Sequence, residues 1–273
     1  MTSKLHFTLL LALAALLGCG SSPTPTTPPA STYLNLTGNW LFSGNANASW
    51  PISQIQGALQ SSDGAVTGTL LAFAYTSPAP CISATQPLSA SGTLSTGGDL
   101  VLTFPIAGGT ATVTAALTSD LQQLPTITNL TNGTWQIVGG DCAMSTTPIF
   151  LTQFAPATGT YTGTLNEIVN DAPVPGTATN VTAVLTQSTT PTADGVFPLN
   201  GTVTATGACV LTITFTDGTV NGPSVGSLPF DSPPVTYSIF GGGINPTATT
   251  LSATLLPFNT CGSQFYNGTL TLQ

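Results

Sequence analysis

The feature that most constrains the fold is a hydrophobic period of two, which recurs from about residue 33 to the C-terminus. Short runs rich in Thr, Val, Leu and Ile alternate apolar with polar side chains, and Gly, Asn, Asp and Pro bound them. Strict alternation places successive side chains on opposite faces of a strand. No stretch in this region has a convincing helical period. The pattern predicts an all-β fold of antiparallel sandwiches or barrels, with clear strands at 66–73, 100–104, 111–117, 181–185 and 210–215.

Residue pairs typical of tight turns separate these runs. Asp63-Gly64, Asp194-Gly195 and Asp217-Gly218 are predicted to be hairpin turns, and the acidic residues in general are expected to be solvated. A phrase of Gly, Thr and an apolar residue recurs and is predicted to open strands; it begins at Gly68, Gly92, Gly133, Gly163, Gly201 and Gly268.

The two halves of the chain resemble each other. Residues 57–70 resemble residues 183–203; Cys81 follows the first segment and Cys209 follows the second. Residues 101–109 likewise resemble residues 235–243; Cys142 follows the first of these and Cys261 the second. This loose repeat predicts two tandem β modules, at 34–148 and 149–273. Their boundary is expected near 143–156, where 145–148 interrupts the strand pattern.

The scarcity of basic residues excludes many functions. The chain has one Lys or Arg and one His, which are Lys4 and His6, and its formal net charge is −8. The chain after His6 therefore contains no His, Lys or Arg. It can have no Ser-His-Asp triad, no Schiff-base lysine, no imidazole metal ligand and no basic patch for nucleic acid. Glu167 and Asp171 are the nearest approach to a catalytic carboxylate pair, and no clustered Asp motif indicates calcium. We expect no enzyme activity, no cofactor, no metal and no nucleic-acid partner.

The N-terminal segment has the form of a secretion signal. Its uncharged stretch, residues 7–17, is shorter than the roughly 20 apolar residues of a membrane-spanning helix. An ordinary secretory signal, cleaved near Gly18, is one interpretation. The other rests on Leu16-Leu17-Gly18-Cys19, which resembles the lipobox of bacterial lipoprotein signals, although Leu17 is bulkier than that family usually has.

The lipoprotein resemblance covers residues 1–19 only and implies a compartment. Residues 1–18 would be removed and Cys19 would carry the lipid that anchors the protein to a membrane. Gly20 follows Cys19 in place of the Asp that favours inner-membrane retention, so the outer membrane of a bacterial envelope is the expected location. Residues 19–33 are rich in Pro, Thr and Ser and are predicted to be an extended tether.

The remaining cysteines predict disulfides. Cys81, Cys142, Cys209 and Cys261 form an even set in an exported chain and allow three pairings. A zinc site is the alternative, but the wide spacings differ from the close pairs typical of zinc ligands. The repeat favours one disulfide per module, namely Cys81–Cys142 and Cys209–Cys261.

The tryptophans provide the candidate binding residues. Trp40 and Trp135 lie in apolar runs and are predicted to be core residues, whereas Trp50 lies in a polar stretch and is the candidate for stacking on a sugar ring. The phrases Gly38-Asn39-Trp40 and Gly133-Thr134-Trp135 weakly resemble the first-strand motif of lipocalin- and avidin-like barrels, without the Arg that the family would add. Three functions remain: a structural or adhesive surface lipoprotein with an envelope protein as partner, a carrier of small apolar ligands in a barrel calyx, and a carbohydrate-binding module.

Overall fold

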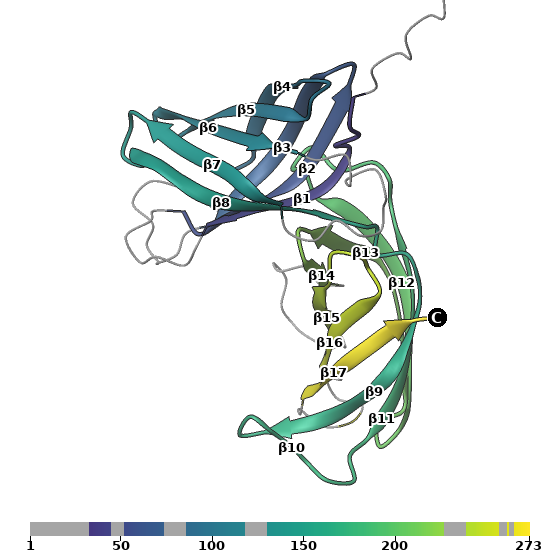
Figure 1. Ribbon diagram of the computed structural model, residues 1–273. Helices are drawn as coiled ribbons and strands as arrows, with labels where there is room; N and C mark the ends of the chain where they lie inside the picture. Colours follow the sequence, from purple (N-terminus) through teal and green to yellow (C-terminus); the bar gives the residue numbers. More distant parts are fainter. Residues whose placement is uncertain are drawn as a thin grey trace, which may run out of the picture. The chain divides into compact units, whose positions relative to one another are not determined.

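The protein is all β in the part that the structure describes. The structure is a computed structural model that describes residues 33–44, 52–73, 86–117, 130–226, 239–256, 261 and 265–273. Strands, turns and irregular segments make up these residues, and they include no helix. It follows that none of the described segments is a helix able to cross a bilayer. The predicted fold class is confirmed, and the strands form two closed antiparallel barrels (Figure 1).

The first barrel contains eight strands in sequence order. Each strand pairs antiparallel with the next, and the last pairs with the first, so that no edge is left open. The strands are β1 (Gly38–Gly44), β2 (Gln54–Ser62), β3 (Ala65–Phe73), β4 (Leu88–Leu94), β5 (Asp99–Ile106), β6 (Gly109–Ala116), β7 (Leu130–Val138) and β8 (Met144–Phe154).

The second barrel repeats this design with one addition. Pairing of β17 with β9 closes the ring, and the two-residue β10 lies beside β9 outside it. The strands are β9 (Gly159–Val169), β10 (Ala172–Pro173), β11 (Thr179–Gln187), β12 (Phe197–Gly207), β13 (Leu211–Asn221), β14 (Ser224–Gly226), β15 (Ile239–Ile244), β16 (Thr250–Leu256) and β17 (Phe265–Leu272).

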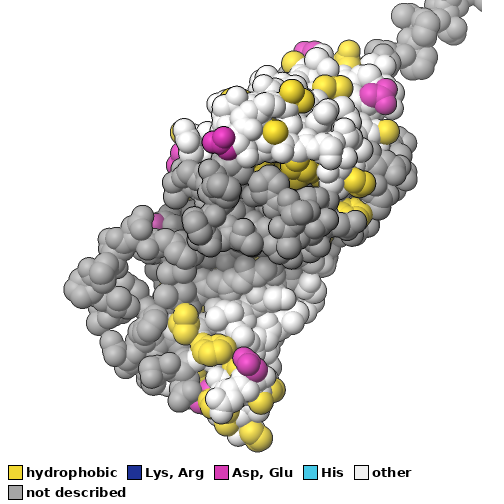
Figure 2. Space-filling view, turned by 90° about the vertical axis from the view of Figure 1, so that its left-hand side faces the viewer, with side chains coloured by type: hydrophobic (Ala, Val, Ile, Leu, Met, Phe, Trp, Pro, Cys, Tyr) yellow, Lys and Arg dark blue, Asp and Glu magenta, His cyan; other side chains and the backbone are white. Residues whose placement is uncertain are grey.

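Alternation along the strands separates core from surface. In β11, Val181, Ala183 and Leu185 are buried while Thr182 and Val184 are exposed. Each barrel has its own cluster of buried apolar side chains, and burying one large side chain contributes roughly 1.5–3 kcal/mol to stability. The described surface in Figure 2 is mostly white, with isolated acidic side chains, which is consistent with outward-facing hydroxyls and amides.

Three of the large aromatic side chains, Trp40, Trp135 and Tyr161, lie inside the barrels, whereas Tyr33 and Phe265 are exposed. Trp40 and Trp135 are fully buried in the first barrel, which confirms their predicted core role, and Trp40 Nε1 donates to Leu36 O at 2.7 Å. Tyr161 fills the second barrel, donates its hydroxyl proton to Ala248 O at 2.8 Å, and has a pKa raised by burial. These side chains are therefore structural and unavailable to stack on an external ligand.

The boundary between the modules lies later in the chain than predicted. β8 continues from Met144 to Phe154 and β9 begins at Gly159, so a boundary between residues 148 and 149 would cut the strand that closes the first barrel. Pro148 misled the prediction because proline usually ends a strand. Here it lies opposite Thr134 in an irregular part of the β7–β8 ladder, and the β8 pairing with β1 involves Ile149 onward.

Two of the three Asp-Gly predictions are confirmed. Asp63 and Gly64 join β2 to β3 with φ of 51° and 81°, as a two-residue hairpin turn requires, and Asp194-Gly195 lies in the β11–β12 connection. The third was wrong, because Asp217 and Gly218 lie inside β13. The β12–β13 register shifts there, so the extra residue forms a bulge in place of a turn.

The Gly-Thr phrase also has a different role from the predicted one. Its glycines lie within strands, not at their starts. A Cβ at Gly68, Gly92 or Gly163 would overlap a backbone carbonyl oxygen of the neighbouring strand. Glycine in the middle of a strand thus permits the close backbone approach and tight bending that a small barrel needs.

Gly92→Ala is expected to lower the free energy of unfolding by about 1–3 kcal/mol. The new Cβ would overlap Val101 O and lie 2.8 Å from Leu102 Cα, so β4 and β5 would have to separate. Urea denaturation measures the change. Gly243→Ala in β15 is the matched control, because a Cβ there meets no atom within 4 Å; equal effects of the two substitutions would contradict the steric explanation.

Candidate functional site

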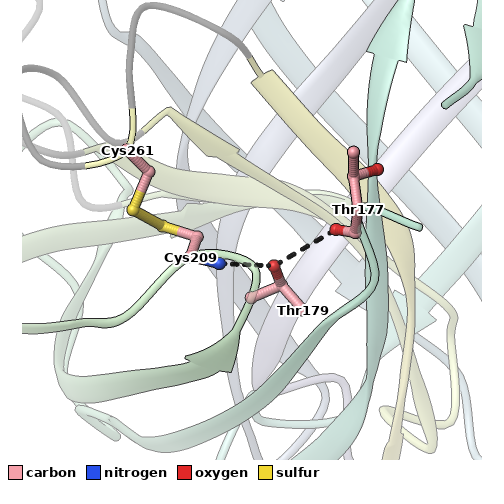
Figure 3. The surroundings of a disulfide bond; sticks show 4 residues. All are labelled: Thr177, Thr179, Cys209 and Cys261. Carbon is pink, nitrogen blue, oxygen red and sulfur yellow. Dashed lines mark hydrogen bonds between the residues drawn. A yellow bond between two sulfur atoms is a disulfide. The ribbon is translucent and has the colours of Figure 1, made fainter. Parts of the chain in front are cut away.

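A disulfide joins two connections of the second barrel. Cys209, between β12 and β13, bonds to Cys261, between β16 and β17, with a Cα–Cα distance of 5.4 Å. The Cys209 backbone N–H donates to Thr179 Oγ1 at 3.1 Å, and that hydroxyl donates to Thr177 O at 3.4 Å (Figure 3). This predicted disulfide is confirmed. The arrangement ties together connections that lie far apart around the ring, which is a structural role.

The structure describes only some of the other predicted site residues. Cys142 is buried and disulfide-bonded, but Cys81, its predicted partner, lies outside the described residues. Cys19, the predicted lipidation site, and Trp50, the predicted sugar-binding residue, also lie outside them. The structure therefore leaves these three assignments as predictions.

The two candidate carboxylates occupy different local environments. Glu167 lies opposite Tyr266 in the β9–β17 ladder, where burial and the Glu167 charge together raise the pKa of Tyr266. Asp171 is exposed and, with Asn170, forms the positive-φ turn between β9 and β10. Among the described residues, no three His, Cys, Asp or Glu side chains gather into a metal-binding group.

The described chain does have a polar junction between its barrels, which lie in one compact unit, Tyr33–Gln273. Asn39 on β1 is 2% exposed; its Nδ2 donates to Gly222 O and its Oδ1 accepts from Gly222 N, both at 2.8 Å. Gly222 lies in the β13–β14 turn with φ of 54°, a conformation that favours glycine. One asparagine side chain thus satisfies both backbone groups of a residue 183 positions away.

Neighbouring residues extend this junction. Ala58 belongs to the buried cluster of the second barrel, and Leu41 packs against that cluster from β1. A Cβ at Gly195 would overlap Thr69 O, so the β11–β12 connection lies directly on β3. The outward face of β1 and β2, which alternation alone would leave in water, is therefore buried by the second barrel.

A groove of about 460 Å³ opens beside the junction. It is lined by residues from the first barrel, from the connection between the barrels and from the second barrel, namely Thr37, Gly38, Asn39, Gln153, Phe154, Ala155, Pro156, Gln187, Ser188, Thr189 and Phe197. None of these lining residues is charged. A smaller cavity of about 320 Å³, lined by residues such as Gln60, Thr67 and Thr192, lies elsewhere between β2, β3 and the β11–β12 connection.

Buried glutamines shape the 460 Å³ groove. Gln153 on β8 is 4% exposed and donates from Nε2 to Thr37 O at 3.1 Å, while its Oε1 has no hydrogen-bond partner in the described structure. Gln187 on β11 accepts at Oε1 from Ala157 N at 2.7 Å, and Ala155 N donates to Pro246 O. These contacts hold the connection between the barrels in place.

The sequence did not identify the junction residues. Asn39, Gln56, Gln153 and Gln187 are polar side chains within strands. Asn39 and Gln56 lie on the outward face of the first barrel, and no local signal distinguishes them from exposed Asn180, because their burial depends on a barrel that is distant in the sequence. Gln153 lies opposite Trp40 and Gln187 is in phase with buried Leu185, so each shares the inward face of its own barrel.

Comparison with known proteins gives no assignment. The chain matches no family model, no curated protein and no solved structure.

Proposed function

We propose that the protein is a lipid-anchored, non-enzymatic component of a bacterial envelope, and that its two barrels form a rigid body for surface binding. Cys19 would hold it on the outer membrane, and residues 19–33 would separate the barrels from the bilayer. The proposal rests on the positions of Lys4 and His6, which are the only Lys, Arg or His residues of the sequence and both precede Cys19. The processed protein would therefore lack basic catalytic and phosphate-binding side chains.

The packing inside the barrels is relevant to the two alternative functions, a calyx carrier of small apolar ligands and a carbohydrate-binding module. A carrier in a calyx would need a large apolar cavity inside a barrel, whereas Trp40, Trp135 and Tyr161 fill space in the two interiors. A carbohydrate-binding module would need exposed aromatic rings; these three rings are buried, and the exposed aromatic residues among those described are Tyr33 and Phe265. Trp50 stays the predicted sugar-stacking residue. Binding at an outer surface or at the junction accords better with these cores.

The anchor has a direct test. Cys19→Ser is expected to abolish incorporation of labelled palmitate and to move the protein from the membrane fraction to the soluble fraction, because no thiol would remain at the lipidation position. Ser21→Ala is the control and should keep the label. Gly20→Asp should keep the label but redirect the protein to the inner membrane.

Labelled palmitate that persists in Cys19→Ser would refute the anchor. Release of the wild-type chain as a soluble protein would instead support the ordinary secretory signal. Either result leaves the barrel structure unaffected, because residues 1–32 lie outside the compact unit Tyr33–Gln273.

A further inference from the structure

We propose that the two barrels are adapted to work in an acidic medium, where they stay folded and soluble without the help of charged side chains. The inference rests on the proposed location outside the cytoplasm and names the condition under which the protein acts there. Three features support it: the absence of basic residues after His6, the neutral contacts that hold the fold, and the hydroxyl groups on the outer face of closed barrels.

Acid unfolds many proteins because it leaves them with a large positive charge. Once the carboxylates are protonated, only basic side chains stay charged, and their mutual repulsion destabilises the compact state. A chain of 273 residues with ordinary composition would carry roughly 30 such charges. Here Lys4 and His6 are the only Lys, Arg or His residues, and the proposed processing removes both. Protonation of the nine acidic residues therefore takes the processed protein toward neutrality.

The loss of ion pairs is the other main cause of acid unfolding, since protonation of a paired carboxylate breaks the pair. No side-chain ion pair can form after His6, because that part of the chain has no cationic side chain. Asp63 and Asp99 are exposed, and they accept hydrogen bonds from the hydroxyls of Ser62 and Ser95. Protonation at these turns therefore affects solvated contacts, not a buried ion pair.

Glu167 is the one partly buried acid among the described residues. It lies opposite Tyr266 in the β9–β17 ladder, and exposed Asp171 follows on the turn after β9. Burial and the Glu167 charge raise the pKa of Tyr266, so this phenol stays protonated and neutral in acid. Protonation of Glu167 thus breaks no attraction to a cation.

The contacts that hold the fold are neutral. The junction uses the Asn39 amide and the backbone of Gly222, and the apolar clusters fill both barrels. The second barrel also has the covalent Cys209–Cys261 link, and exchange of a disulfide requires a thiolate, which acid suppresses. None of these contacts changes its protonation between neutral and acidic pH.

Hydroxyl groups, which do not titrate in this range, keep the surface polar when the charge is lost. A protein with no net charge tends to associate. One row of threonines crosses four neighbouring strands of the second barrel, since Thr162, Thr182, Thr204 and Thr212 lie opposite one another in successive ladders. They alternate with buried residues and so point outward. Closure of the barrel ring also removes strand edges that other proteins protect with charged residues such as Lys.

The first test compares stability at neutral and acidic pH. The full-length processed protein in an uncharged detergent is unfolded with urea at about pH 7 and at about pH 2, which is below the ordinary pKa values of carboxylic acids. Tryptophan fluorescence follows the transition. We expect the two free energies of unfolding to agree within about 15%, the uncertainty of the extrapolation. Loss of more than half of the free energy of unfolding in acid would overturn the inference.

A fourfold variant tests the role of the hydroxyl row. Thr162→Val, Thr182→Val, Thr204→Val and Thr212→Val together keep the shape and strand propensity of the side chains but make the row apolar. We expect this variant to stay monomeric at neutral pH, where the ionised acidic residues oppose association, and to associate at about pH 2. Glutamine at the same four positions is the matched control and should stay monomeric at both pH values. Light scattering measures association, and near-ultraviolet circular dichroism verifies folding.

A valine variant that stays monomeric in acid would contradict the proposed role of the hydroxyls. Palmitate labelling at Cys19 is scored separately. Loss of the label with unchanged acid stability would refute the anchor alone, whereas acid unfolding of the labelled protein would refute the acid adaptation alone.

Discussion

Replacing Cys209 and Cys261 together by alanine is expected to lower the free energy of unfolding of the second barrel by about 4 kcal/mol. The disulfide links residues 52 positions apart, and opening a loop of this length restores conformational entropy to the unfolded chain. The native structure should change little, because the Cys209 backbone remains hydrogen-bonded to Thr179. Urea denaturation with a tyrosine and tryptophan fluorescence signal measures the loss.

The double variant is more informative than chemical reduction, because Cys142 is also disulfide-bonded and a reductant would open that bond too. The matched control is Ser252→Ala, at an exposed position of β16 in the same barrel, which should alter stability by less than about 0.5 kcal/mol. A loss below about 1 kcal/mol in the double variant would show that the 52-residue loop is already restricted in the unfolded state.

Asn39→Leu is expected to destabilise the junction between the barrels by about 3 kcal/mol. The substitution removes the hydrogen bonds to Gly222 N and Gly222 O and leaves both backbone groups buried without their partner. Because each barrel has its own core, we expect calorimetry to resolve two unfolding transitions in the variant, one for each barrel. In the wild type the two barrels should unfold at closer temperatures.

Asn180→Leu provides the control for Asn39→Leu. Asn180 lies exposed on β11 and accepts a hydrogen bond from Thr164 Oγ1 at 3.1 Å, so the same substitution there removes only a solvated contact. If the two variants lost equal stability, the Asn39–Gly222 contact would contribute nothing specific to the junction. A single coincident transition in Asn39→Leu would show that other contacts suffice to couple the barrels.

Local pattern predicted the strands but not how they close. Val181, Ala183 and Leu185 alternate with Thr182 and Val184, and β11 orients them as the pattern requires. Closure depends on pairing β1 with β8 and β9 with β17, which are separated by most of a module. Alternation is the same in a sandwich and in a barrel, so the sequence left both open.

Glycine was the least informative signal because one residue type has several roles. Gly64 adopts the positive φ of a hairpin turn, whereas Gly92 lies mid-strand where a Cβ would overlap the next strand. Both roles require the absence of a side chain, and only the backbone path shows which one applies. The same ambiguity explains why Asp217-Gly218 was predicted to be a turn and is a bulge.

The sequence by itself determined the all-β class and the core positions of Trp40 and Trp135, because alternation is a property of nearby residues. The repeated cysteine positions favoured the Cys209–Cys261 pair among three possible pairings, and the structure confirms it. Tertiary structure alone decided that Asn39 and Gln153 are buried. Alternation directs Asn39 away from the first barrel's interior, where water would ordinarily surround it, whereas Gln153 lies opposite Trp40 and shares its inward face. The second barrel covers the outward face that carries Asn39, and it thereby turns an ordinary surface amide into the hydrogen-bonded junction.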